Sequence, residues 1–530
     1  MALVTVSAVF AQRAGLDRIR ITDLRADLTF LASDALEGRR SLDRGSEVTI
    51  QFLAAEFAKA GLQPLAGDTF LQPVPLIEYR LDTNESRFAI DRGSARQEKK
   101  YGVDFFGGSP FESSIQAPVA FAGYGITAPE FGYDDYASLD AHGKIVLVFE
   151  HEPQENDPHS IFNGLGNTRH ANELVKMLNA KKHGAIGILF VAEPNRKHPS
   201  IQERIARIPG STQRARRLPP QALAEDEVRL PAFSVSDAVA VDLLAATGKK
   251  PGELQSSIDE TLKPVSQVLP GIRVEMRVVL AEQRRGTSYN VVGMVEGSDP
   301  SLNKETIVFS AHYDHDGAWD GTVRYGADDN GSGTVGVTEL ARAFAASSEK
   351  PKRSLVFAIF AAEERGLLGS YYYAAHPLRP LASTRAVINF DMIGRNETPS
   401  QQTEGLIEIA ADTSNELNLI GTVNSPDYRA TVERENEFVG LKLNYKWDND
   451  AALNIFQRSD QFPFSLHDVP AIWWFTGFHP DYHQTTDTVE KINFVKMQKI
   501  LRLAYLTGWE FANAAATPRF VERPMGGGSR

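Results

Sequence analysis

The chain has 530 residues, of which 42% are hydrophobic and 23% are charged, as in a soluble globular protein of two to four units. Acidic residues outnumber basic ones by 68 to 56, which argues against a nucleic-acid partner. The absence of cysteine excludes disulfides, thiolate zinc sites and cysteine nucleophiles, so that His, Asp or Glu must hold any metal. No apolar run approaches the ~20 residues that span a bilayer.

The two ends differ in composition from the rest of the chain. Residues 2–10 form a short apolar run, and Ala11 follows it where a signal peptidase would cut. We therefore interpret residues 1–22 as a residual signal peptide and expect a secreted or periplasmic protein. The Gly-rich segment 516–530 is predicted to be a flexible tail.

Residues 23–112 are expected to form the first part of the main domain. Apolar residues recur at helical spacing between residues 23 and 60, and Gly61 is placed to end the second helix. A stretch rich in strand-forming residues follows, to about residue 108.

Residues 113–268 differ in residue pattern from the segments on either side and are predicted to form an inserted domain. Residues 144–149 (KIVLVF) and 185–191 (AIGILFV) resemble buried strands, and 172–182 a helix. The charged segment 196–227, which contains three prolines, is interpreted as a surface loop.

Residues 269–515 alternate apolar strands with helices. Expected strands are 290–295, 306–310, 355–361, 386–390, 407–410 and 471–475, and expected helices include 334–346 and 494–512. This alternation predicts an α/β fold with a mixed, mostly parallel sheet and helices on both faces.

Metal-binding residue types follow four of these strands. His312, Glu363 with Glu364, Asp391 and His483 each come after an apolar strand, and Asp329 lies in a Gly-rich segment before a helix. Because sites in open α/β sheets lie beyond the carboxyl ends of the strands, we expect these residues to meet.

Two histidines and three carboxylates suit zinc, which binds imidazole nitrogen and carboxylate oxygen. Five ligands are too few for two zinc ions unless one carboxylate bridges them, together with a bridging water. The remaining glutamate of the pair would then be free to accept a proton from that water as it attacks a carbonyl group.

The segments SAHYDHDG, GADDNGSG, FAAEERGLLGS, NFDMIG and FHPDYHQTTDT resemble, in order, the motifs of zinc metallopeptidase family 28, which includes secreted bacterial aminopeptidases. Residues 31–39 and 60–64 also resemble that family. The resemblance covers about residues 24–110 and 270–512. It implies a zinc aminopeptidase-like fold and hydrolysis of N-terminal residues from peptides or small amino-acyl substrates, with two Zn²⁺ per chain.

The resemblance also implies a role for each residue. One zinc ion would be held by His312, Asp329 and Asp391, and the other by Asp329, Glu364 and His483. Glu363 would be the general base that activates the metal-bridging water, and Asp314 would orient His312.

Two further features bear on substrate handling. Residues 124–125, 144–149 and 181–190 resemble a protease-associated domain, a module that some members insert at this point. Many members also have a tyrosine where this chain has Phe456, so the hydroxyl that helps hold the oxyanion is missing. Gln457 or Arg458 could serve instead, or the metals could do more of this work.

Other functions stay open at this level. A carboxypeptidase or dipeptidase of the same family would need a basic residue for the substrate carboxylate, for which Arg395 or Arg458 is available. A one-zinc glutaminyl cyclase and an inactive receptor-like scaffold are disfavoured by the complete ligand set.

Overall fold

The computed structural model describes residues 15–162, 166–208, 210–225, 228–450 and 452–521. Most of the expected signal peptide (1–22) and of the expected tail (516–530) lies outside these residues. Within the described part of the chain, none of the helices combines the length and the apolar character needed to cross a membrane.

The larger of the two main sheets has ten strands and carries all the expected strand-end residues. Its order is β11-β2-β14-β18-β15-β19-β22-β20-β21, and β1 pairs with β14. The central strands β18, β15, β19 and β22 are parallel, whereas β14 and β20 flank them antiparallel. The expected mixed α/β fold is confirmed, with the parallel pairing concentrated at the centre. The bounds are β1 (Gln63–Pro64), β2 (Leu71–Leu81), β11 (Gln221–Leu223), β14 (Leu280–Val295), β15 (Thr306–His312), β18 (Ser354–Phe360), β19 (Thr384–Phe390), β20 (Glu416–Ile420), β21 (Lys442–Asn444) and β22 (Ala471–Phe475).

Helices cover both faces of this sheet because the side chains of its strands alternate between two apolar layers. Phe309 and Phe357 lie in the core that includes residues of α2, α3, α9 and α13. Val308 and Val356 point to the other face, against residues of α10 and α12. These helices are α2 (Ile21–Leu31), α3 (Arg44–Ala60), α9 (Gly333–Ala345), α10 (Leu368–Ala375), α12 (Gln461–Ser465) and α13 (Phe494–Asn513), and α11 (Pro426–Asn436) packs on α13.

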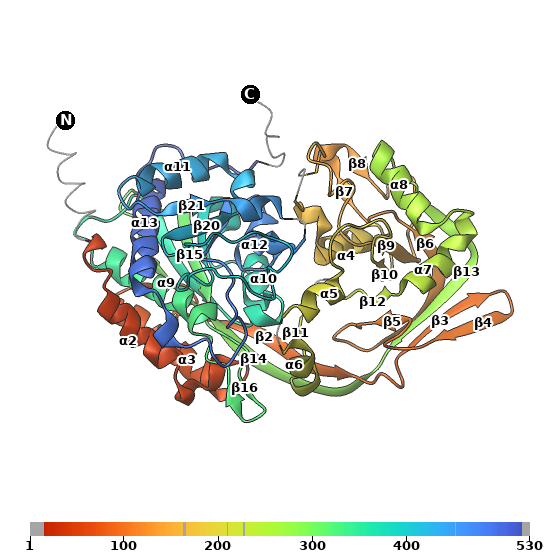
Figure 1. Ribbon diagram of the computed structural model, residues 1–530, viewed down its shortest axis with the longest axis horizontal. Coiled ribbons are helices and arrows are strands. Elements are labelled where there is room, and N and C mark those ends of the chain that lie inside the picture. Colours follow the sequence, from red (N-terminus) through yellow and green to blue (C-terminus); the bar gives the residue numbers. More distant parts are fainter. Residues whose placement is uncertain (1–14, 163–165, 209, 226–227, 451, 522–530) are drawn as a thin grey trace.

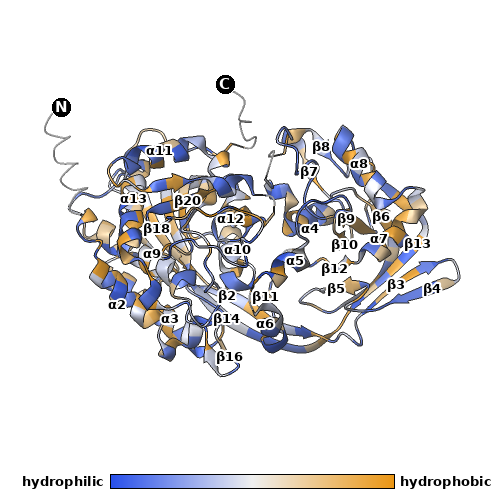
Figure 2. Cartoon of the chain, in the orientation of Figure 1, coloured by the Kyte–Doolittle hydropathy of each residue, from blue (hydrophilic) through white to orange (hydrophobic). Residues whose placement is uncertain are grey.

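The second sheet has eight strands in the order β4-β3-β13-β6-β9-β10-β12-β5 and lies beside the first (Figure 1). Strands β6, β9, β10 and β12 are parallel, and the outer pairs are antiparallel. Helices α4, α7 and α8 belong to this unit, and Figure 2 shows hydrophilic and hydrophobic stretches alternating along α8 as they do along α3. The bounds are β3 (Arg87–Arg92), β4 (Ala95–Lys99), β5 (Phe105–Phe106), β6 (Ser113–Phe121), β9 (Ile145–Phe149), β10 (Gly187–Val191), β12 (Ala232–Val235), β13 (Gln267–Val278), α4 (Glu173–Lys182), α7 (Asp237–Leu244) and α8 (Pro251–Thr261).

Sheet membership differs from the domain boundaries expected at residues 113 and 268. Strands β3, β4 and β5 precede residue 113 yet pair in the second sheet. Strand β13 extends that sheet to Val278, and only Val279 separates it from β14 of the main sheet. Strand β11, from within the expected insertion, pairs with β2 of the main sheet. Backbone pairing across such distances leaves no local pattern in the sequence.

Two local predictions were wrong. Residues 407–410 form no strand, and β20 pairs with β22 instead. The polar residues Glu416 and Asn418 are buried in β20 and interrupt its apolar pattern. The segment 196–227 is not a plain loop, since it contains α5 (Ile201–Ala206), α6 (Ser211–Arg217) and β11. Ser200 and Glu203 form a capping box that starts α5, and Pro219 and Pro220 follow α6 without interrupting it.

Candidate metal centre

The carboxyl edge of the central parallel strands gathers all five residues predicted as metal ligands. His312 is the last residue of β15, Asp391 directly follows β19, and Glu364 lies in the turn after β18. His483 comes from the loop after β22, and Asp329 from the irregular turn before α9. Neighbouring strands thus bring residues more than 170 positions apart to one place.

The first group surrounds the Nε2 atom of His312. This atom lies 3.6 Å from Asp329 Oδ1, 3.5 Å from Asp391 Oδ1 and 3.6 Å from Glu363 Oε2. Ligand atoms of His312, Asp329 and Asp391 all lie within 4.8 Å of one another.

The second group surrounds the Nε2 atom of His483. It lies 3.2 Å from Asp329 Oδ2 and 3.5 Å from Glu364 Oε2. One oxygen of Asp329 therefore faces each histidine, which is the arrangement that a bridging carboxylate requires.

Hydrogen bonds fix which nitrogen of each imidazole faces the carboxylates. His312 Nδ1 lies 3.1 Å from the backbone carbonyl of Asp314, and His483 Nδ1 lies 2.8 Å from Asp316 Oδ2. The Asp314 carbonyl can only accept, so His312 Nδ1 carries the proton and Nε2 presents a lone pair to the cluster. His483 Nδ1 also lies 2.9 Å from Arg214 Nη1, and its Nε2 likewise faces the cluster.

Asp314 orients His312 through its main chain more than through its side chain. The carboxylate Oδ1 lies 3.8 Å from His312 Nδ1 and accepts a hydrogen bond of 2.9 Å from the backbone N–H of Glu363. Burial raises the pKa of Asp314 to about 6, although the nearby His312 lowers it. Asp314 therefore contacts both His312 and the turn that carries the two glutamates.

The centre concentrates negative charge at buried and partly buried positions. His312 is fully buried and its Nε2 has no hydrogen-bond partner. Burial lowers the pKa of His312, but Glu363 and Asp391 outweigh this effect and raise it well above its ordinary value. Burial together with the neighbouring Asp391 raises the pKa of Glu363 well above its usual range, although His312 opposes the shift. Such groups are costly to bury unless a cation joins them.

Asp329 is held in place through the backbone of its turn. Asp487 Oδ2 accepts hydrogen bonds from the backbone N–H groups of Asp328 (2.9 Å) and Asp329 (3.2 Å). Asn330 Nδ2 donates to the Phe390 carbonyl, one residue before Asp391. The turn is therefore tied both to the His483 loop and to the end of β19.

Arg39, in the N-terminal segment 31–39, binds the backbone of the segments next to the centre. Its fully buried guanidinium donates to the backbone carbonyls of Leu31 (2.6 Å), Tyr313 (2.7 Å), Tyr325 (2.6 Å) and Gly326 (2.8 Å). Burial lowers the pKa of Arg39 to about 10, although the carboxylate of Asp314 counters the shift. One side chain thus joins the segments that carry Asp314 and Asp329.

We expect Arg39→Met to destabilise the protein by about 3–5 kcal/mol, because it leaves four carbonyls without their charged donor. Urea unfolding followed by circular dichroism would measure the change. Arg44→Met, at an exposed position beginning α3, is the matched control and is expected to change stability by less than about 0.5 kcal/mol. Equal stability of the two variants would contradict the role given to Arg39.

Three residues around the centre were not assigned roles by sequence reasoning. His315 Nδ1 lies 2.8 Å from Glu364 Oε1, and Asp316 contacts both His483 and Arg214. His315 and Asp316 belong to the motif HYDHDG, whose density of polar groups was the available signal. Arg214 comes from α6 and lies 2.5 Å from Asp316 Oδ1. No signal identified Arg214, because its segment resembled a surface loop.

The candidate substrate residues have different surroundings. Both polar ends of Gln457 bind the segment 168–172, through the Thr168 carbonyl (3.1 Å) and Asn172 (3.1 Å). Arg395 pairs with Asp481 at 2.7 Å and Asp487 at 3.5 Å, so its charge is already matched.

Arg458 is the candidate that faces open space. It lines a cavity of about 340 Å³ between the two sheet units, together with Glu150, His151, Arg204, Tyr371 and Gln457. Arg458 also donates to the Tyr482 hydroxyl at 3.3 Å, next to His483. A tyrosine hydroxyl is thus present beside the centre, although Phe456 offers none.

Comparisons with known proteins relate this chain to a family of peptidases. Residues 290–507 match the sequence model of peptidase family M28. Leucine aminopeptidase 2 of Trichophyton rubrum is 28% identical over 243 residues, which are 42% of this chain and 44% of that protein. Leupeptin-inactivating enzyme 1 of Streptomyces exfoliatus is 36% identical over 206 residues, 39% of each chain. This chain therefore aligns with less than half the length of these relatives.

Among solved structures, the aminopeptidase from Aneurinibacillus sp. strain AM-1 aligns with 97% of this chain and 98% of its own, at 19% identity and a TM-score of 0.48. The match to the family model covers β15, β18, β19, β22 and the loops that follow them. Residues 290–507, which match the sequence model of peptidase family M28, carry all five predicted metal ligands, and the site that these ligands form is called the M28 centre below.

Proposed function

We propose that the protein is a two-zinc aminopeptidase that removes N-terminal residues from peptides. His312, Asp329 and Asp391 would hold one ion, and Asp329, Glu364 and His483 the other. The observation that carries the proposal is the position of Asp329, with one carboxylate oxygen 3.6 Å from His312 Nε2 and the other 3.2 Å from His483 Nε2.

The charge of the centre fits two divalent cations. Four carboxylates, those of Asp329, Glu363, Glu364 and Asp391, surround the Nε2 atoms of His312 and His483. With both histidines neutral, two ions of charge +2 balance these four negative charges. A single ion would leave two buried carboxylates uncompensated, at a cost of several kcal/mol.

Zinc in such a site acts as a Lewis acid toward a carbonyl group and lowers the pKa of water. Glu363 is suited to accept a proton, because its carboxylate lies beside the centre and its backbone is fixed by Asp314. It would take the proton from the attacking water and deliver it to the leaving amine.

The surroundings favour a substrate with a free amine over one with a free carboxylate. The centre is acidic, and an ammonium group gains from nearby carboxylates. Of the two arginines that a carboxypeptidase could use, Arg395 is paired with two aspartates. Arg458 remains available to bind a substrate carboxylate. Carboxypeptidase or dipeptidase action is therefore the alternative function that the experiment must exclude.

We further propose that the second sheet unit, together with the segment that carries α5 and α6, limits access to the centre. Arg214 of α6 reaches Asp316, and Gln457 binds segment 168–172, so this unit contacts both sides of the centre. We also propose that the protein is exported to the periplasm or the medium and that each chain binds two zinc ions. The named relatives include a probable lipoprotein aminopeptidase of Mycobacterium tuberculosis, 27% identical over 292 residues.

A panel of substrates tests the proposed activity. Amino-acid arylamides, N-acetylated peptides and C-amidated peptides would be compared before and after treatment with a chelator. We expect cleavage of arylamides and C-amidated peptides, no cleavage of N-acetylated peptides, and recovery of activity on adding zinc. Cleavage of N-acetylated peptides at full rate, with loss of activity on C-amidation, would instead indicate a carboxypeptidase.

A further inference from the structure

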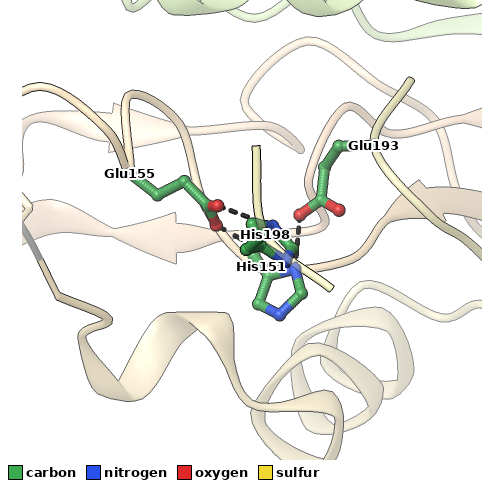
Figure 3. Close-up of side chains that lie close together, drawn as sticks. All are labelled: His151, Glu155, Glu193 and His198. Carbon is green, nitrogen blue, oxygen red and sulfur yellow. Dashed lines mark hydrogen bonds and ion pairs between the residues drawn. The ribbon is translucent and has the colours of Figure 1, made fainter. Parts of the chain in front are cut away.

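A second group of metal-binding side chains lies in the other sheet unit, away from the M28 centre. Figure 3 shows His151, Glu155, Glu193 and His198 directed toward one another. His151 comes two residues after β9, and Glu193 two residues after β10, the parallel neighbour of β9. Adjacent parallel strands again bring polar residues together at their carboxyl ends.

The four side chains are close and almost completely buried. His151 Nδ1 lies 2.6 Å from Glu193 Oε1 and 4.0 Å from Glu155 Oε2, and His198 Nε2 lies 2.6 Å from Glu155 Oε1. One ligand atom of each residue lies within 4.8 Å of the others. Side-chain exposure is 2% for His151, 8% for Glu155, 2% for Glu193 and 3% for His198.

Protein groups leave part of this cluster unsatisfied. Glu155 Oε2 and Glu193 Oε2 are buried and accept no hydrogen bond from the residues that the structure describes. An ionised carboxylate oxygen buried without a partner costs roughly 1–3 kcal/mol or more. Two such oxygens on adjacent side chains indicate a missing positive partner.

The hydrogen bond of His198 Nδ1 leaves Nε2 directed at Glu155, whose Oε1 lies 2.6 Å away, and a bound cation would replace that contact. His198 Nδ1 lies 2.9 Å from the carbonyl oxygen of Pro199, which can only accept, so Nδ1 carries the proton. The lone pair of Nε2 then faces Glu155. A ligand nitrogen whose other ring nitrogen donates to a backbone carbonyl is the usual arrangement of a metal-bound histidine.

The backbone of His151 is equally fixed. The buried ammonium group of Lys176 donates to the carbonyls of His151 (2.5 Å) and Phe149 (3.0 Å). His151 Nε2 lies 3.2 Å from Arg204 Nη1. Binding of a cation at His151 Nδ1 would move the proton to Nε2, so this contact would be lost while Arg204 keeps its hydrogen bond of 3.1 Å to the Pro199 carbonyl.

We propose that His151, Glu155, Glu193 and His198 form a structural zinc site. Two imidazole nitrogens and two carboxylate oxygens are a tetrahedral ligand set for zinc, whereas calcium and magnesium prefer oxygen alone. Zinc–ligand bonds of about 2.0–2.1 Å place tetrahedral ligands roughly 3.3 Å apart, between the 2.6 and 4.0 Å contacts found here. Zinc and two carboxylates together are neutral, which suits a buried position.

The ion has a route into the site. Glu155 and Glu193 line a cavity of about 360 Å³ that also contacts Tyr124, Asn195 and Asp259. A buried metal site requires such an entry path in addition to its ligands.

The site's position gives it a structural role. Glu193 and His198 bracket the start of the segment that continues through α5 and α6 to Arg214, which contacts Asp316 in the M28 centre. Zinc would bind the start of this segment to the loop after β9. The segment would thereby be fixed at His198 in the second unit and at Arg214 beside the M28 centre.

The alternative is a pair of buried His–Glu ion pairs without a metal. The same unit contains such a pair in Glu130 and His170, 2.7 Å apart, where Arg169 also lies 3.4 Å from Glu130. Among the described residues, no second His–Glu pair joins it in a metal-ligand group. Glu130→Gln is therefore the matched control for Glu193→Gln. Both replacements keep side-chain volume and remove one carboxylate charge next to a histidine.

The first test counts metal in the full-length chain carrying Asp329→Ala, which disables the M28 centre under the proposed function. After dialysis against zinc and then against buffer, we expect mass spectrometry of the metal to find about one zinc per chain. Adding Glu193→Gln should reduce this to less than about 0.2, whereas adding Glu130→Gln should leave it unchanged. Equal zinc in the Glu193→Gln and Glu130→Gln chains, or no zinc in Asp329→Ala alone, would overturn the site.

A second measurement needs no variant. Anomalous scattering at the zinc edge from crystals of the zinc-saturated chain is expected to give a peak among the four side chains, separate from any peak at the M28 centre. A crystal with zinc at the M28 centre and none at His151 would disprove this inference alone. A peak at His151 with none at the M28 centre would disprove the proposed two-zinc function alone.

Discussion

Replacing Glu363 by Gln is expected to lower kcat by about 10²–10⁴-fold while the metals of the centre remain bound, because the change removes the proton acceptor and not a ligand. Gln keeps the volume of the side chain, and the hydrogen bond from the Glu363 backbone N–H to Asp314 does not depend on the side chain. The loss should appear mainly in kcat, since a general base acts in the transition state and contributes little to substrate binding.

Steady-state kinetics with an amino-acid arylamide, together with metal analysis, would measure this effect. Glu364→Gln is the informative comparison, because the neighbouring side chain lies against His483 and His315 instead of beside His312. We expect that variant to lose metal as well as activity. A Glu363→Gln enzyme that retains a near wild-type rate would show that another group accepts the proton.

Replacing Asp329 by Ala is expected to remove both metals from the M28 centre and to abolish measurable activity. Each of its oxygens faces a different histidine, so the change withdraws one ligand from each ion. Loss of a single ligand from a three-residue site weakens metal binding far more than loss of a neighbouring hydrogen-bonding group, which costs about 10–100-fold.

Asp391→Ala is the matched control. Asp391 Oδ1 lies 3.5 Å from His312 Nε2, and the described residues show no ion pair between Asp391 and His483. Isothermal titration with zinc into metal-free protein should detect one fewer binding event for Asp391→Ala and two fewer for Asp329→Ala. Loss of the same number of ions from both variants would show that Asp329 is a terminal ligand and not a bridge.

The local part of the fold could be predicted well from the sequence. Strands β9, β15, β18, β19 and β22 were recognised because strands buried on both faces are continuous apolar runs. Helices α9 and α13 were recognised by their helical periodicity, and Gly61 ends α3 in the left-handed conformation expected of a C-cap. Strand β20 was missed because buried polar residues interrupt its apolar run, and one of them, Glu416, pairs with Lys442 at 2.8 Å.

The candidate centre was also largely predictable, for a reason that lies in topology. Once β15, β18, β19 and β22 are parallel neighbours, residues just beyond their carboxyl ends must converge, however far apart they lie in the chain. Arg214 could not be predicted in this way, because it arrives from another sheet unit through a segment with no apolar pattern.

The sequence by itself determined which residue types could hold metal, which strands they follow and which motifs they belong to, because these properties depend on neighbours along the chain. Only the tertiary structure decided that Asp329 divides its oxygens between His312 and His483, that Arg214 crosses to the centre, and that His151 meets His198. Those contacts depend on how β13 and β14 join the two sheets and on where α5 and α6 lie. Long-range packing of this kind produces no periodic pattern of residues along the chain.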